Sequence, residues 1–265
     1  MRSIGRLASA ALLAAVAIPA LAGAQERQRE PNAFQWSGRV PEGRWLRVRN
    51  INGSVRVVAG TGANAEVTAE KTWRRGRPEQ VRIEMVRDGE NVTICAIWHQ
   101  NVRCDAEGYH GSGRTEESND VAVEFTVRLP RGVNTLVTSV NGGVSVEGAS
   151  GQVVAETTNG GINISSSGGP VEAETTNGSI QASMGTATLS DDLSFRTVNG
   201  SVTLTLPASI NAVLEMETVN GRLSSDFPLT LSGSISPRNI RATLGSGGRR
   251  LEARTVNGSV TIKRS

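Results

Sequence analysis

Aromatic residues are scarce in this chain of 265 residues, where Phe, Trp and Tyr together make up 3%. This scarcity argues against a sugar or nucleobase groove lined by aromatic rings. Histidine and cysteine occur only twice each, and lysine only at Lys71 and Lys263. Two of the 28 basic residues lie in an N-terminal segment set aside below, so 26 remain against 25 acidic residues. A net charge near +1 excludes nucleic-acid binding that is driven by bulk charge.

Long apolar runs are also absent, except at the N-terminus. Residues 1–24 contain two arginines, then an apolar run from Leu7 to Ala20, then Ala22-Gly23-Ala24. This is the pattern of a secretory signal peptide, and the run is short for a membrane span. We expect cleavage after Ala24 and a flexible mature N-terminus over residues 25–33. The protein would then be exported, either periplasmic or secreted to the cell surface, with no transmembrane segment in the mature chain. An uncleaved N-terminal anchor is the alternative.

Glycine, by contrast, is abundant, with 30 residues, and much of it stands in a repeated Asn-Gly dipeptide. Most of the spacings between these dipeptides are 18 to 22 residues, and a fixed period of this size is typical of a solenoid. The last spacing, 37, equals about two steps if Asn239 marks a degenerate copy. The dipeptides begin at Asn52, Asn141, Asn159, Asn177, Asn199, Asn220 and Asn257 and end at Gly53, Gly142, Gly160, Gly178, Gly200, Gly221 and Gly258.

Apolar residues alternate with polar ones in the same register around every Asn-Gly. They stand six and four residues before the asparagine and three and five after it, as Leu193, Phe195, Val202 and Leu204 do around Asn199. A period of two predicts strands with one buried face. The fold class is therefore all-β, and we expect a β-solenoid, parallel β-helix-like, with coils of about 18–22 residues.

The repeat pattern divides the chain into two regions. Residues 131–265 form the repetitive solenoid, whereas 34–130 hold a first coil around Asn52 and a longer excursion over 64–130. All four tryptophans lie in the first hundred residues. We expect this region to form a strand-rich N-terminal cap that covers the end of the solenoid, in one continuous domain with the repeats.

Stacked coils place equivalent residues about 4.8 Å apart, so the repeat predicts ladders of like side chains. The asparagine amides would hydrogen-bond along one ladder, and the Thr two residues earlier would form a second. We expect the Asn-Gly turns to need a positive φ at glycine. Three residues before each asparagine, an outer column of charges would form an exposed strip with Arg196 between Glu174 and Glu217. Its members are Glu156, Glu174, Arg196, Glu217 and Arg254.

The two cysteines, Cys95 and Cys104, flank the short connection that contains His99. Export favours a disulfide between them, which would staple a hairpin-like excursion. A catalytic Cys–His pair with His99 or His110 is the alternative, but nothing else in the segment organises a nucleophile site.

No residues form a recognisable catalytic, metal or cofactor pattern. His99 and His110 with Asp105, Glu107, Glu116 and Glu117 match no zinc spacing. Four of the six lie in residues 106–120, which have the composition of a mobile loop rather than a metal site. Asp191 and Asp192 are adjacent before a predicted strand, where neighbours point to opposite faces, so they make a poor acid–base pair. We therefore expect a protein without catalytic residues, metal or cofactor.

Three stretches carry a resemblance to a known family. They are Leu46-x-Val48-x-Asn50-x-Asn52-Gly53-x-Val55-x-Val57, the strand Ile94-Cys95-Ala96-Ile97-Trp98, and the repeated Thr-Val-Asn-Gly-Ser-Val block. Residues 34–265 resemble the bacterial "putative adhesin" domain of unknown function, which is related to head domains of some autotransporter adhesins. The resemblance implies an exported β-solenoid and implies no shared activity.

Three functions remain open. The first is a non-catalytic, exported adhesin-like or scaffold protein that presents a surface to an envelope or surface protein or to a glycan. The second is a β-helix protein that binds or cleaves polysaccharide. The third is an envelope-stress or signalling accessory whose tryptophan-bearing cap docks a membrane protein.

Overall fold

Strands dominate the computed structural model, which describes residues 32–111, 119–166, 168–231 and 236–265. This part of the chain contains 23 strands and one short 3-10 helix, η1 (Pro78–Gln80). The predicted all-β class is confirmed. The expected signal peptide lies outside the described residues, as do residues 25–31 and Glu116 and Glu117 of the predicted loop. Within the described residues, no helix has the length and apolarity needed to cross a membrane.

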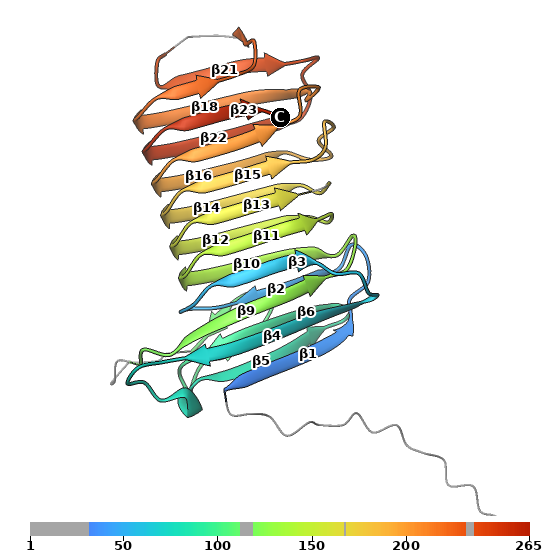
Figure 1. Ribbon diagram of the computed structural model, residues 1–265, viewed down its shortest axis with the longest axis vertical. Helices are drawn as coiled ribbons and strands as arrows, with labels where there is room; N and C mark the ends of the chain where they lie inside the picture. The colour runs from blue at the N-terminus through green and yellow to red at the C-terminus, as the bar shows by residue number, and fades with distance from the viewer. Residues whose placement is uncertain (1–31, 112–118, 167, 232–235) are drawn as a thin grey trace, which may run out of the picture.

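Two large sheets run the length of the molecule (Figure 1). Sheet A has ten strands, in spatial order β1 (Ala33–Arg39), β4 (Asn64–Thr72), β9 (Ala122–Leu129), β3 (Val55–Ala59), β11 (Val144–Ala149), β13 (Ile162–Ser166), β15 (Ile180–Met184), β17 (Val202–Leu206), β23 (Val260–Arg264) and β19 (Leu223–Ser225).

Sheet B has eleven strands and lies beside sheet A. Their spatial order is β20 (Thr230–Leu231), β21 (Asn239–Leu244), β18 (Ala212–Asn220), β22 (Arg250–Asn257), β16 (Leu193–Asn199), β14 (Val171–Asn177), β12 (Val153–Asn159), β10 (Asn134–Asn141), β2 (Trp45–Arg49), β6 (Asn91–Ile97) and β5 (Arg82–Asp88). A separate two-stranded hairpin consists of β7 (Arg103–Cys104) and β8 (Tyr109–His110).

Each Asn-Gly repeat contributes one strand to each sheet. The strand before the turn lies in sheet B and the strand after it in sheet A, as β14 and β15 do around Asn177. Successive repeats stack in parallel without a register shift at the asparagines, which pair Asn159 with Asn177 and Asn177 with Asn199. The repeat therefore sets the strand order in the middle of both sheets.

Both sheets are mixed rather than uniformly parallel. Near the N-terminal end, β9 and β6 extend the parallel stacking, and β4, β1 and β5 then add antiparallel strands. At the other end, β21 pairs antiparallel with β18. The region 64–130 is strand-rich as predicted, but its strands β4, β5, β6 and β9 continue the two sheets instead of forming an excursion beside them. Asn239 is not a degenerate repeat, because it begins the antiparallel strand β21.

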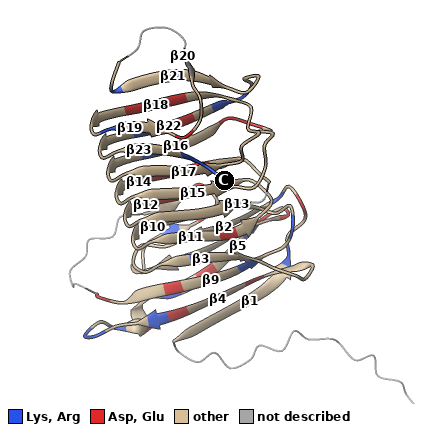
Figure 2. Cartoon of the chain, turned by 45° about the horizontal axis from the view of Figure 1, so that its top comes forward, with Lys and Arg blue, Asp and Glu red and all other residues tan. Residues whose placement is uncertain are grey.

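The last repeat does not stack last. Strand β22 lies between β16 and β18 (Figure 1), and β23 lies between β17 and β19 (Figure 2). The repeat that contains Asn257 therefore sits between those of Asn199 and Asn220. The expected order, in which repeats follow the chain to the end, is wrong at this point.

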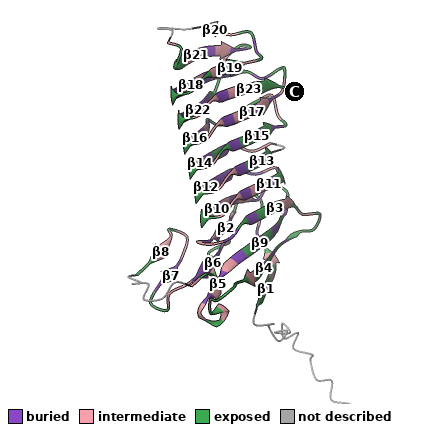
Figure 3. Ribbon diagram, turned by 60° about the vertical axis from the view of Figure 1, so that its left-hand side comes forward, coloured by how far each residue is buried: buried purple, intermediate pink, exposed green. Residues whose placement is uncertain are grey.

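One continuous core fills the space between the sheets. The alternating positions singled out around the Asn-Gly turns are buried, and Figure 3 shows the resulting alternation of buried and exposed residues along the strands. Leu193 is 2% exposed, and Phe195, Val202 and Leu204 are fully buried. Trp36 and Trp98 pack against the N-terminal part of this core, whereas Trp73 is 40% exposed.

The turns form a corner held by two hydrogen-bond ladders. Six asparagine amides donate from Nδ2 to Oδ1 of the stacked neighbour at 2.8 Å, and these bonds join all seven asparagines in the order 52, 141, 159, 177, 199, 257, 220. Behind them, buried Thr hydroxyls donate to glycine carbonyls of the neighbouring repeat, as Thr175 does to Gly160 at 2.9 Å. Each buried hydroxyl in this row thus has the partner that burial requires.

Glycine is required at these turns mainly because of stacking. Of the seven, only Gly53 (φ 112°) and Gly258 (φ 158°) have a positive φ, so the expected left-handed turn is wrong for the other five. A Cβ at Gly200 would lie 2.5 Å from the carbonyl carbon of Gly178 and closer still to its oxygen. The backbone of the neighbouring repeat occupies the space that a side chain would need.

Candidate functional site

The outer face of sheet A carries two parallel rows of small polar side chains. One row contains Ser145, Asn163, Gln181 and Thr203, which pair across β11, β13, β15 and β17. The second row, two residues further along each strand, contains Glu147, Ser165, Ser183, Thr205 and, on β23, Lys263. These residues line a shallow groove of about 320 Å³ that runs across the strands.

The middle of this groove is neutral, and its polar groups are free. Strands β13, β15 and β17 contain no charged residue, and they are uniformly tan in Figure 2. Among the described residues, six groove side chains make no hydrogen bond to the protein: Asn163, Ser165, Gln181, Ser183, Thr203 and Thr205. The charges stand at the ends of the second row, and Glu147 is paired with Arg56 at 3.0 Å. The groove therefore offers donors and acceptors without net charge.

The outer face of sheet B carries the predicted charged column, but in a different order. Because the last repeat is inserted, Arg196 lies between Glu174 and Arg254, and Glu217 follows Arg254. The predicted neighbour pair of Arg196 and Glu217 is therefore wrong. Arg254 lies 3.4 Å from Glu217, while Glu174 has no ion pair with Arg196 among the described residues.

A buried glutamate, absent from the predicted column, organises this face. Glu252 is 3% exposed, and its carboxylate lies 2.9 Å from Arg196 Nη2 and 2.5 Å from Arg254 Nε. It bridges the two arginines that stack next to each other and so offsets their repulsion. Arg49 also belongs to the column, next to Thr138 and then Glu156. Its offset of three residues from Asn52 is the signal that could have placed it there.

Three acidic side chains gather in the middle of the same face. Partial burial, together with the negative charges of Glu174 and Glu172, raises the pKa of Glu156. Glu156 and Glu174 pair directly across β12 and β14. Like charges in this position destabilise a sheet.

Asp191 and Asp192 line a pocket of about 200 Å³ on sheet B, together with Glu172 and Glu252. The acids are largely engaged by neighbours, since Asp192 accepts the backbone N–H of Arg250 at 2.9 Å and its carboxylate lies 3.5 Å from the side chain of Arg250. The sequence pattern separated these residues, and the stacking of β14, β16 and β22 brings them together.

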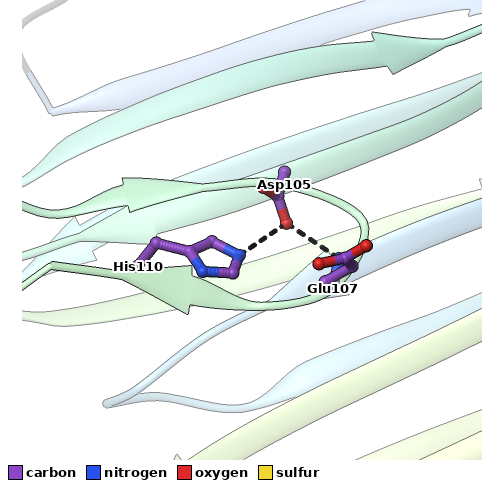
Figure 4. A group of neighbouring side chains, drawn as sticks. All are labelled: Asp105, Glu107 and His110. Atoms are coloured by element: carbon purple, nitrogen blue, oxygen red, sulfur yellow. Dashed lines mark hydrogen bonds and ion pairs between the residues drawn. The ribbon is translucent and has the colours of Figure 1, made fainter.

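Cys95 and Cys104 form a disulfide that ties the β7–β8 hairpin to β6. At the tip of this hairpin, Asp105, Glu107 and His110 come together, with ligand atoms within 4.8 Å of one another (Figure 4). Asp105 Oδ1 accepts the backbone N–H of Glu107 at 2.8 Å and contacts His110 Nε2 at 2.9 Å.

The bonds of Asp105 account for the geometry of the hairpin tip. The backbone N–H of Glu107 and then the His110 side chain lower the pKa of Asp105. This is the arrangement of a side-chain-capped turn. His99 does not belong to the group.

Comparisons with solved structures give weak likenesses. A crystal structure described as a "putative cell adhesion protein" from Clostridium sporogenes matches with 11% identity and a TM-score of 0.42, covering 88% of this chain and 99% of that one. A "putative adhesin" from Bacteroides fragilis matches with 10% identity and a TM-score of 0.28, over 88% and 97% of the two chains. The chain has no significant match among curated proteins.

The family comparison is the informative one. The family model described as Toastrack DUF4097 matches residues 115–263, more than half of the chain. These residues include every Asn-Gly repeat except the one at Asn52. The chain therefore belongs to the Toastrack DUF4097 family.

Proposed function

We propose that this protein is a non-catalytic, exported β-solenoid module that presents the outer faces of its stacked sheets to an envelope or extracellular partner. One observation carries the proposal. Polar groups at the Asn-Gly corner are hydrogen-bonded in ladders, whereas six polar side chains on the outer face of sheet A have no protein partner among the described residues. Exposed polar groups in fixed rows are available for a ligand without any change in the fold.

The charged residues support binding rather than catalysis. A polysaccharide-cleaving enzyme of the common type needs a pair of carboxyl groups free to act as acid and base or nucleophile. Here Glu252 is held by two arginines, and Asp192 is held by Arg250. The signal-peptide pattern of residues 1–24 supports export.

Fractionation and proximity labelling of the tagged full-length protein in its native cell test this proposal. We expect the protein in the periplasmic or surface fraction, and a reproducible set of labelled envelope components. Filling the sheet A groove with Ser183→Tyr should remove part of that set, and Thr176→Tyr, on the outer face of sheet B in the same repeat, serves as the control. Recovery of the protein in the cytosolic fraction, or a set of labelled components that is the same in both variants as in the wild type, would reject the proposal.

Polysaccharide cleavage is the second candidate, favoured by the acid-rich pocket that contains Asp191 and Asp192. Release of new reducing ends from polysaccharide, abolished by Asp192→Asn, would establish it.

The third candidate, a signalling accessory, depends on the N-terminal cap. Deleting residues 64–130 would remove strands from both sheets, so the exposed Trp73 is the better target. Loss of a membrane-protein partner in Trp73→Ser alone would favour this function.

A further inference from the structure

The groove on sheet A is elongated and open, unlike a closed pocket. It crosses β11, β13, β15, β17 and β23, which are successive strands of one sheet. Adjacent strands lie about 4.8 Å apart, so the groove is about 19 Å long. Its two rows repeat the same kind of side chain on each strand, so a ligand unit that fits against one strand also fits against the next.

The chemistry of the rows selects for hydroxyl groups. Asn163 and Gln181 each offer two N–H donors and a carbonyl acceptor, while Ser165, Ser183, Thr203 and Thr205 each offer a hydroxyl that both donates and accepts. None of these six groups has a protein partner among the described residues. A sugar ring presents the complementary set, because each of its hydroxyls also donates and accepts. In an extended polysaccharide, successive rings advance by about one strand spacing.

Other occupants fit this groove less well. A protein partner would need apolar or aromatic anchors, which dominate protein interfaces, and the exposed side chains here are small and polar. An acidic polymer would need a row of cations, and Lys263 is the one cationic residue lining the groove. In the repeats that carry the groove, acidic and basic side chains lie mainly on the outer face of sheet B.

We propose that the sheet A groove binds a neutral, extended polysaccharide chain that lies along the axis of the stack, perpendicular to the strands. This inference rests on the proposed function and names the ligand class for one of its two faces. Each sugar ring binds weakly because no aromatic side chain stacks on it. The affinity therefore increases with the number of sugar rings that lie in the groove. The same six side chains bind the sugars wherever the chain is placed along the groove.

Calorimetric titration of the purified protein with neutral linear oligosaccharides of increasing length tests this inference. The probes are cello-, xylo-, manno- and malto-oligosaccharides, with oligogalacturonates as acidic counterparts. We expect a neutral hexasaccharide to bind at least tenfold more tightly than the matching disaccharide, a difference of about 1.4 kcal/mol. Ser183→Tyr, which fills the middle of the groove, should weaken binding at least tenfold, and Gln181→Ala should weaken it by a smaller factor.

The matched control is Thr176→Tyr, an equally exposed position of the same repeat on sheet B, which should leave binding unchanged. Thermal melting confirms that each variant is folded. The inference is overturned if no neutral oligosaccharide binds, if acidic probes bind more tightly, or if Ser183→Tyr binds like the wild type. In those cases, groove-dependent labelling of an envelope protein in the cell would still uphold the proposed function, and its absence would reject both.

Discussion

The glycine of a stacked turn gives the sharpest prediction about stability. In Gly200→Ala the new Cβ would lie 2.5 Å from the carbonyl carbon of Gly178, where ordinary contact begins at 3.4 Å. The neighbouring repeats must therefore separate locally by at least 0.9 Å, the difference between these two distances.

Three hydrogen bonds cross the stack next to Gly200. The Gly178 N–H donates to the Asn199 carbonyl at 2.9 Å, the Asn199 side chain donates to Asn177 at 2.8 Å, and Thr197 donates to Gly178 at 2.8 Å. At about 1 kcal/mol each, their loss destabilises the fold by about 3 kcal/mol. For a chain of this size that lowers the melting temperature by roughly 6–12 °C.

Thermal unfolding followed by circular dichroism measures the effect, and two further variants identify its cause. Gly43→Ala sits at φ 75° with nothing within 4 Å of the added Cβ, so it reports backbone strain alone, about 1 kcal/mol. Gly200→Asn should destabilise at least as much as alanine, because asparagine relieves a left-handed turn but not a collision. A melting temperature that is unchanged in Gly200→Ala, or restored by asparagine, would refute the stacking argument.

Three further predictions concern strand order, the threonine row and the acidic cluster. The double variant Val198→Cys/Val256→Cys should form a disulfide on oxidation, because these two positions lie on adjacent strands. The double variant Val198→Cys/Val219→Cys should not, because β22 lies between its two positions. Non-reducing electrophoresis shows which variant is cross-linked. Thr175→Val should cost about 1–3 kcal/mol because the carbonyl of Gly160, in a partly buried hydrogen bond, loses its donor, and a wild-type urea midpoint would contradict this. The raised pKa of Glu156 means that its charge opposes folding above that pKa and that the penalty disappears as the pH falls through it. Glu156→Gln should therefore raise the melting temperature slightly near neutral pH and not below about pH 4, and a gain that persists in acid would contradict it.

The sequence was sufficient to predict the core and the ladders. Alternation with a period of two, held in one register around each Asn-Gly, identified Phe195 and Leu204 as buried residues. The repeated spacing likewise predicted contacts between stacked asparagines. These features depend on the local pattern and its period, and both can be found in the amino-acid sequence.

The position of the last repeat could not be predicted in the same way. The repeats at Asn199 and Asn257 share the same Thr-Val-Asn-Gly-Ser-Val block. The spacing of 37 residues after Asn220 therefore fits either stacking order. The choice depends on how the chain continues after Asn220, where β19 ends the stack in sheet A and β21 pairs antiparallel with β18 in sheet B.

Three further features depend on contacts between stacked repeats. Glu252 is buried because Arg196 and Arg254 become neighbours only after the insertion. Gly200 needs to be a glycine because of a neighbouring backbone, although its dipeptide is the same one that favours a left-handed turn. The groove on sheet A was missed because Ser, Thr, Asn and Gln in alternation are ordinary for an exposed strand face, and only the stacked order aligns them.

Incubation of the purified protein with polysaccharide isolated from its native cell envelope tests the central claim most directly. Co-sedimentation measures binding, and the release of reducing ends measures cleavage in the same tube. The account predicts that the wild type and Thr176→Tyr sediment with the polymer, that Ser183→Tyr does not, and that no reducing ends appear. Reducing ends that accumulate with the wild type and disappear with Asp192→Asn would contradict it and establish an enzyme.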